Sequence, residues 1–216
     1  MDKRWDRLKD LSAPAALAFL AASAAIGRSL SHLPEPERTI SNAQQNRWGV
    51  LVGGYMATVA SLLLLVFSAR LRERLKADQA EAGLLPDLAF GGGVATSVLL
   101  GGASMLPVAI AERRPIDGRI SPDVAAFAND VGTLMMGKVA PMTMAAMTGA
   151  TTLVAHEQRT LPRWLTGSGA AITVGLLSPV NFLFVVFGLI WIAVLGAVLA
   201  TRSTPAGSDM DATEVA

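Results

Sequence analysis

Three long stretches of this chain carry no charged residue, and they constrain the fold more than any other feature. Residues 48 to 69 form an uncharged run of 22 residues, residues 88 to 111 a run of 24, and residues 182 to 201 a run of 20. Because a helix rises about 1.5 Å per residue, each run is long enough to cross a hydrocarbon core of about 30 Å. The fold class we expect is all-α, a polytopic transmembrane helix bundle.

Three weaker segments bring the prediction to about six helices. Residues 131 to 154 are 24 long with one charge, Lys138, whereas residues 164 to 180 are 17 long and only just reach across a bilayer. The alanine-rich segment 11 to 30 ends close to Arg28. A basic flank and small residues near its centre also fit a cleaved signal peptide, so that reading is the alternative to the retained helix that we predict.

Composition supports the membrane class and excludes several kinds of site. Hydrophobic residues make up 52% of the 216, charged residues only 16%, and the mean hydropathy is +0.46. The net charge of +1 argues against a nucleic-acid partner, and the lack of cysteine excludes disulfides and thiolate metal sites. We therefore expect no cofactor and no metal, one transmembrane domain over residues 1 to 216, and a disordered tail at 203 to 216.

The distribution of lysine and arginine predicts the orientation of the six helices. With a cytoplasmic N-terminus, the segments inside the cell hold eleven of these residues and the outside segments six. The cluster RLRERLK at 70 to 76, directly after the clearest span, carries much of this bias. Both termini are therefore expected to face the cytoplasm, which puts His32 outside and His156 inside, too far apart to share a metal ion.

Small residues recur at four-residue spacing in three of the predicted helices. Residues four apart lie on one helix face, where small side chains allow a second backbone to approach closely. The rows that we expect to pack in this way include Gly93, Ser97 and Gly101, then Gly137 and Gly149, and finally Gly167 and Gly175. Five methionines between 135 and 147 also fit a copper(I) site, but their directions scatter around a helix, and packing is the preferred interpretation.

Lys138 lies inside the predicted span 131 to 154 and defines a candidate polar intramembrane site. Its long side chain can extend toward the external headgroups, with its stem against apolar surface. Alternatively it faces the bundle interior, where a charge needs water or a partner, and Asp130 and Tyr55 are the candidate partners. An interior Lys138 would be suited to binding an anion or relaying protons.

The segment TLPRWLTGSGA, residues 160 to 170, is explained locally by a helix start at Pro162 and an interfacial Trp164. It also resembles a segment before the fifth helix in an uncharacterised family of small bacterial integral membrane proteins with about six helices. The SARLRERL segment after the second span and the tryptophan in the last span are similar too. The resemblance implies a fold and a location in the inner, or plasma, membrane. It implies no catalytic residues, because that family has no established activity.

The functional expectation is an accessory, sensory or structural membrane bundle, in contact with lipid and with other membrane proteins or further copies of itself. The alternative is a transporter of small solutes or protons that uses the polar site around Lys138. An intramembrane enzyme is disfavoured, since the sequence contains no G-x-S-x-G, H-E-x-x-H or Walker motif.

The predicted orientation is testable by single-cysteine labelling, for which a cysteine-free chain is a clean background. We expect an impermeant thiol reagent added outside the cell to label Arg38→Cys and Asp117→Cys, and to leave Arg74→Cys and Arg159→Cys unlabelled. The opposite labelling pattern would reverse the orientation.

Overall fold

The computed structural model describes residues 3–26, 45–78, 83–112 and 121–202 of the chain. Within these ranges every regular element is helical, in agreement with the all-α prediction. The elements are α1 (Lys3–Ile26), α3 (Arg47–Asp78), α4 (Leu85–Glu112), α5 (Pro122–Leu134), a π-helical segment (Met135–Val139), α6 (Ala140–Gln158), α7 (Arg163–Leu177) and α8 (Asn181–Arg202).

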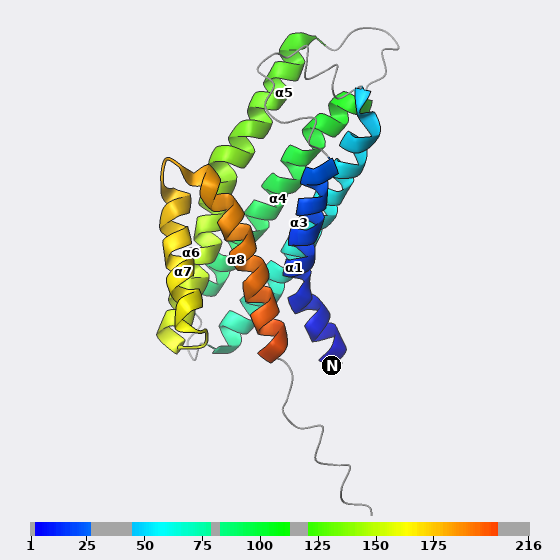
Figure 1. Ribbon diagram of the computed structural model, residues 1–216. Helices are drawn as coiled ribbons and strands as arrows, with labels where there is room; N and C mark the ends of the chain where they lie inside the picture. Colours follow the sequence, from blue (N-terminus) through cyan, green and yellow to red (C-terminus); the bar gives the residue numbers. More distant parts are fainter. Residues whose placement is uncertain (1–2, 27–44, 79–82, 113–120, 203–216) are drawn as a thin grey trace, which may run out of the picture.

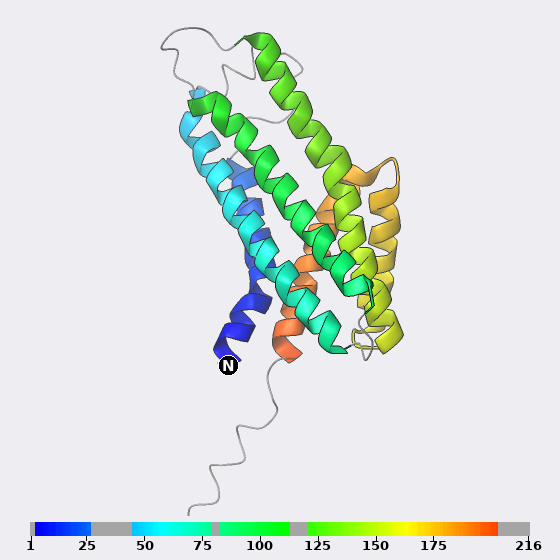
Figure 2. The ribbon, with the colours of Figure 1, turned by 180° about the vertical axis from the view of Figure 1, so that it is seen from behind.

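The helices run up and down in turn and close into a ring (Figures 1 and 2). Each helix packs on its neighbours in sequence: α1 on α3, α3 on α4, α4 on α6, α6 on α7, and α7 on α8. The ring closes because α8 also packs on α1. The start of α1 and the end of α8 therefore lie at the same end of the bundle, which we call the terminal end (Figure 1).

Three helices of the described residues are long and apolar enough to cross a membrane. They cover Arg47–Ala77, Leu85–Glu112 and Leu183–Arg202, and they correspond to the three uncharged runs. The predicted first span contains a shorter apolar helix, Leu11–Ala25, and α7 is only 15 residues long. The described residues are thus all-helical and include three helices suited to crossing a membrane, while the count of six spans stays a prediction.

The outer surface of the ring carries apolar stripes over parts of α3 and α8. On α3 the exposed large side chains include Val52, Tyr55, Val59, Leu62 and Val66, which follow the spacing of a single helix face. On α8 the exposed residues Leu183, Val186, Phe187 and Ile190 follow the same spacing. Since soluble proteins seldom expose continuous apolar stripes of this length, these faces are suited to contact with lipid.

The helix that contains the fourth predicted span is longer than the prediction of residues 131 to 154. We expected a helix beginning at residue 131, but α5, the π-helical segment and α6 form one continuous helix of 13, 5 and 19 residues from Pro122 to Gln158. Its length of about 55 Å exceeds the thickness of a hydrocarbon core. Ser121 and Pro122 begin it early, because a proline in the first turn fits the helix without losing a hydrogen bond. The α5 part rises above the rest of the bundle (Figure 1).

Hydrogen bonds between side chains or to backbone carbonyls join most neighbouring helices. The hydroxyls of Thr96 on α4 and Thr143 on α6 lie 2.9 Å apart, as do those of Thr148 on α6 and Thr173 on α7. The indole N–H of the buried Trp191 on α8 donates to the carbonyl oxygen of Leu165 on α7 at 3.0 Å. Such bonds strengthen helix association where the surrounding medium is apolar.

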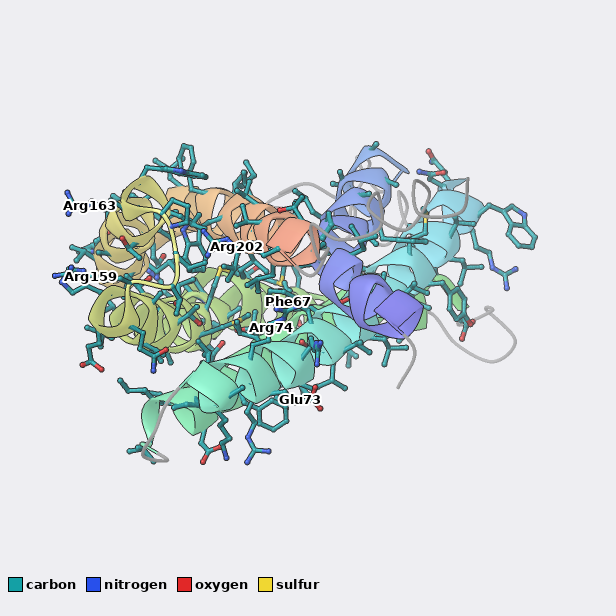
Figure 3. All side chains as sticks on the ribbon, turned by 90° about the horizontal axis from the view of Figure 1, so that it is seen from below. Phe67, Glu73, Arg74, Arg159, Arg163 and Arg202 are labelled. Carbon is teal, nitrogen blue, oxygen red and sulfur yellow. The ribbon has the colours of Figure 1, made fainter. Side chains whose placement is uncertain are left out.

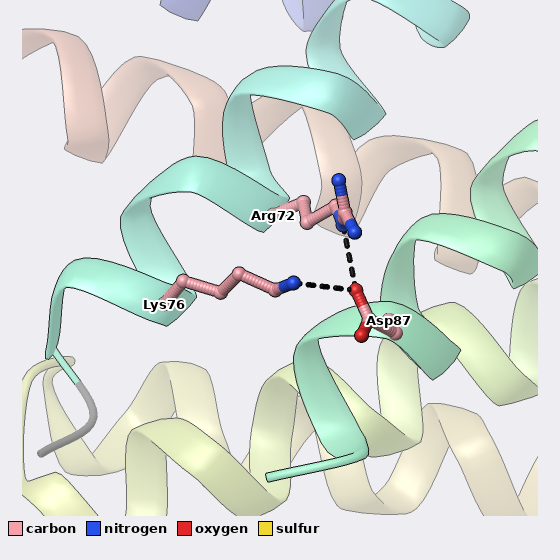
Figure 4. A network of polar contacts seen from close by, with 3 residues as sticks. All are labelled: Arg72, Lys76 and Asp87. Atoms are coloured by element: carbon pink, nitrogen blue, oxygen red, sulfur yellow. Dashed lines mark hydrogen bonds and ion pairs between the residues drawn. The ribbon is translucent and has the colours of Figure 1, made fainter. Parts of the chain in front are cut away.

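An ion-pair network joins α3 to α4 at the terminal end (Figure 4). The carboxylate of Asp87, in the first turn of α4, accepts from Arg72 Nε at 2.6 Å and from Lys76 Nζ at 2.9 Å. Arg72 also lies 5.3 Å from the ring centre of Phe90. Because an acidic residue at a helix N-terminus is itself favourable, this network fixes where α4 begins against the end of α3.

Close helix contact depends on glycines on α4. A Cβ added at Gly92 would stand 2.6 Å from the carbonyl oxygen of Thr143 and 2.7 Å from the backbone nitrogen of Met147, so α4 and α6 meet there at the level of their backbones. A Cβ at Gly93 would stand 2.7 Å from the Ser68 Cβ on α3. One glycine therefore faces α6 and the next faces α3, which places α4 between these two helices.

The predicted rows of small residues differ in what they contact. A Cβ at Gly101 would lie 3.3 Å from Ser61 Oγ and one at Gly149 3.1 Å from Thr173 Cγ2, whereas one at Gly175 would overlap the Phe184 ring. Ser97 is buried and donates to the Gly93 carbonyl oxygen at 2.8 Å. Gly137 and Gly167 have open space where a Cβ would stand, so they make no close helix contact within the described chain. Tight glycines outside the predicted rows are Gly54, Gly92, Gly169 and Gly188.

We expect Gly92→Ala to destabilise the bundle by about 1–3 kcal/mol, because the added methyl group meets backbone atoms that cannot rotate away. Gly102→Ala is the matched control, since it lies on the same helix with nothing within 4 Å of its added Cβ. The control should be neutral or stabilising by up to about 1 kcal/mol through helix propensity. Thermal unfolding in detergent measures both, and equal effects of the two substitutions would show that α4 and α6 do not touch at Gly92.

Candidate functional site

Lys138, the residue on which the candidate polar site depends, lies exposed on the surface of the described chain. It belongs to the π-helical segment, none of whose residues is buried. Lys138 precedes Ala155 by 17 residues, so the two are about 25 Å apart along the helix axis. The polar residues His156 and Glu157 follow Ala155 at the terminal end. Were a hydrocarbon core of about 30 Å to begin at Ala155, Lys138 would lie close to its far side, where a long cationic side chain can reach the headgroups.

The π-helical segment has a local cause in Pro141. A proline in a helix interior lacks an N–H and crowds the carbonyl group four residues earlier, which here belongs to Gly137. The chain relieves this crowding by a wider turn, in which the N–H of Ala140 donates to the carbonyl oxygen of Met135, five residues back. The wider turn changes the direction in which Lys138 leaves the helix, and such turns are frequent at functional sites.

The two proposed partners of Lys138 are also exposed and lie apart from it. Asp130 is on α5, two helical turns before Lys138 on the same long helix. Tyr55 is 58% exposed on the outer stripe of α3, a helix that makes no substantial contact with the π-helical segment among the described residues. Within the described part of the chain no hydrogen bond or ion pair joins these three residues. The single chain does not bring them together in its interior.

Two of the five methionines belong to the core and two face outward. Met144 and Met147 are fully buried, against α8 at Gly188 and α4 at Gly93 respectively, while Met136 and Met142 are exposed. The searched, described residues contain no group of three or more histidines, cysteines, aspartates or glutamates positioned for a metal ion. Met144 and Met147 pack against neighbouring glycines, a role suited to adaptable apolar side chains.

Hydroxyl groups supply much of the buried polar surface. Ser61, Ser68, Thr96, Thr148 and Thr151 are all buried, and each donates to the backbone carbonyl oxygen four residues earlier at 2.7 to 3.0 Å. These bonds satisfy the hydroxyl groups within their own helices. Thr152 differs, because its buried hydroxyl has no hydrogen-bond partner among the described residues and lies where a side chain at Gly169 would stand.

Charged side chains gather instead at the terminal end of the bundle (Figure 3). Arg74 from α3 and Arg202 from α8 lie over this end, and Arg159 and Arg163 stand at its edge. In the sequence these arginines indicate only the orientation of the helices. Their positions at the ends of different predicted spans are the signal that predicts that they lie close together. Up-and-down helices bring alternate span ends to one side of a bundle.

Comparison with known proteins gives no relative from which a site can be transferred. The sequence matches no protein-family model, no curated protein and no solved structure. Functional inference for this chain therefore depends on its own residues.

We expect Lys138→Leu to leave thermal stability in detergent nearly unchanged, within about 0.5 kcal/mol, because Lys138 is a surface residue away from buried contacts. Thr148→Val, which removes a buried hydroxyl bonded to Thr173, is the comparison and should cost about 1 kcal/mol. A large loss of stability for Lys138→Leu would indicate that the lysine has a partner in the assembled protein.

Proposed function

We propose that this protein is an accessory, sensory or structural helical bundle of a bacterial plasma membrane. The observation that carries the proposal is the character of the interior. The buried polar residues of the described chain are serines, threonines and one asparagine, and no charged residue is among them. Transporters of protons and ions depend on ionisable groups that face the bundle interior or a water-filled path.

Close packing supports the same proposal. Backbone contact at Gly92 and the fully buried Phe67 and Met147 fill the space between α3, α4 and α6, and Met144 packs against α8 at Gly188. Rearranging this region would require helices that touch at backbone level to slide past one another, since packed interiors deform in discrete steps. A bundle of this kind is suited to holding partners or its own copies in a defined arrangement.

The proposed membrane orientation has six spans and both termini in the cytoplasm. Its support is that the start of α1 and the end of α8 share one end, to which α3 also brings Arg70, Arg72, Arg74 and Lys76 (Figures 1 and 3). Cations at span ends favour the cytoplasmic side. The family resemblance noted for residues 160 to 170 agrees with this location and stays a prediction.

A second candidate function is the transport of a small solute or a proton through a site that includes Lys138. The observation in its favour is the π-helical turn at Met135–Val139, which departs from regular helix at the one intramembrane lysine. In this candidate the exposed lysine would face a partner helix or a second copy of the chain rather than lipid.

Flux measurement on purified protein in sealed vesicles distinguishes the two functions. For the accessory bundle we expect an imposed pH gradient to decay at the rate of empty vesicles, both for the wild-type protein and for Lys138→Leu. Accelerated decay with wild-type protein that Lys138→Leu abolishes would replace the accessory function with transport. Gly102→Ala serves as a substitution control, because Gly102 is exposed and nothing lies within 4 Å of its added Cβ.

A further inference from the structure

An open pocket of about 630 Å³ lies at the terminal end of the bundle. Its walls come from the ends of α3, α6 and α8 and from the connection between α6 and α7. Four arginines line it, Arg70, Arg74, Arg159 and Arg202, against one acidic residue, Glu73. Arg70 and Arg74 are one helical turn apart on α3, so their side chains lie on the same face of the helix.

The pocket is polar at its mouth and apolar at its base. The leucines that line it are Leu71, Leu75, Leu161, Leu195 and Leu199. Leu71, Leu75 and Leu195 belong to the buried core, so the floor of the pocket continues into the bundle. A ligand that fills it would carry a negative group toward the arginines and an apolar part toward the leucines.

The depth of the arginines matches the headgroup layer. Arg70 directly follows the uncharged run 48 to 69, and Arg202 directly follows the run 182 to 201. Groups at the end of a transmembrane run lie where hydrocarbon gives way to headgroups. The exposed Trp164, at the start of α7, is suited to the same interface.

Two of the arginines are held in ways that suit a binding role. The Arg202 guanidinium donates to the carbonyl oxygen of Thr160, which fixes the end of α8 over the α6–α7 connection. Arg159 ends α6 with φ 54° and ψ 29°, a left-handed conformation that glycine adopts more easily than arginine. A strained residue beside a charged pocket is the kind of outlier that points to function.

We propose that this pocket binds the phosphate-bearing headgroup of an anionic phospholipid from the adjoining leaflet. Guanidinium groups bind phosphate through paired, charge-assisted hydrogen bonds, and basic pockets between membrane helices are suited to such headgroups. The leucine-lined base accommodates the glycerol and the first part of the acyl chains. A free phosphate ester shares the charged chemistry but has no apolar part for the leucines.

The test measures lipid binding by the purified full chain. Delipidated protein receives phosphatidylglycerol or phosphatidylcholine, and retained lipid is measured by native mass spectrometry alongside the shift in melting temperature. We expect phosphatidylglycerol to be retained and to raise the melting temperature, and phosphatidylcholine to do neither to the same extent. Equal behaviour of the two lipids would overturn the proposal.

Arg202→Gln and Arg159→Gly test the pocket itself. Each should weaken phosphatidylglycerol binding roughly fivefold, the usual contribution of one basic residue near an anionic surface. Arg159→Gly removes the side chain while relieving the left-handed backbone, so the variant should fold at least as stably as the wild type. A folded Arg159→Gly protein that binds the lipid at full strength, together with full binding by Arg202→Gln, would contradict the site.

Arg163→Gln is the matched control, because Arg163 is exposed at the same end but does not line the pocket. It should retain lipid binding, and a loss as large as in the pocket variants would mean that surface charge alone attracts the lipid. Inorganic phosphate and glycerol 3-phosphate form the last arm. They should not raise the melting temperature at concentrations where the lipid does, and equal stabilisation by either would replace the lipid with a soluble phosphate ligand.

Discussion

Backbone contact between α4 and α6 at Gly92 is the constraint around which the ring is arranged. Inside a bilayer the hydrophobic effect gives helices little reason to associate, because lipid tails are as apolar as leucine. Helices then adhere through close packing and through hydrogen bonds that span their interface. Gly92 provides the first, and the Thr96–Thr143 pair one turn away provides the second. With α4 held against α6 on one side and α3 on the other, the remaining helices complete the ring.

The distribution of polarity over the ring separates its parts by role. The outer faces of α3 and α8 are apolar stripes, the interior holds hydroxyls bonded to their own helices, and charge is concentrated at the helix ends. A charge is expensive in hydrocarbon, whereas a hydroxyl can satisfy itself on a carbonyl one turn back. This arrangement favours a stable bundle with its chemistry at an interface. Because charge is concentrated at the helix ends, the arginine-lined pocket is a better candidate for a binding site than Lys138.

Lys138 is an example of a residue whose position in the sequence suggests an interior charge but whose side chain is exposed in the structure. A lysine in an apolar run suggests an interior charge, and Asp130 is at a suitable spacing to be its partner. The helix, however, begins at Pro122, nine residues earlier than the predicted span, and both Asp130 and Lys138 are exposed on it. Where a transmembrane helix starts relative to the bilayer depends on how it packs on its neighbours, and hydropathy records only which residues tolerate lipid.

The sequence alone determined the helical class and the three clearest spans, because runs of 20 or more uncharged residues have few alternatives to a membrane helix. The spacing of small residues predicted rows, and Gly93 and Gly175 do stand where a side chain would collide with a neighbouring helix. Only the tertiary structure decided that Gly92 meets a backbone while Gly137 and Gly167 face open space, and that arginines from α3, α6 and α8 line one pocket. The physical reason is that spacing within one helix defines a face, whereas the identity of its partner depends on the rotation and position of a second helix far away in the sequence.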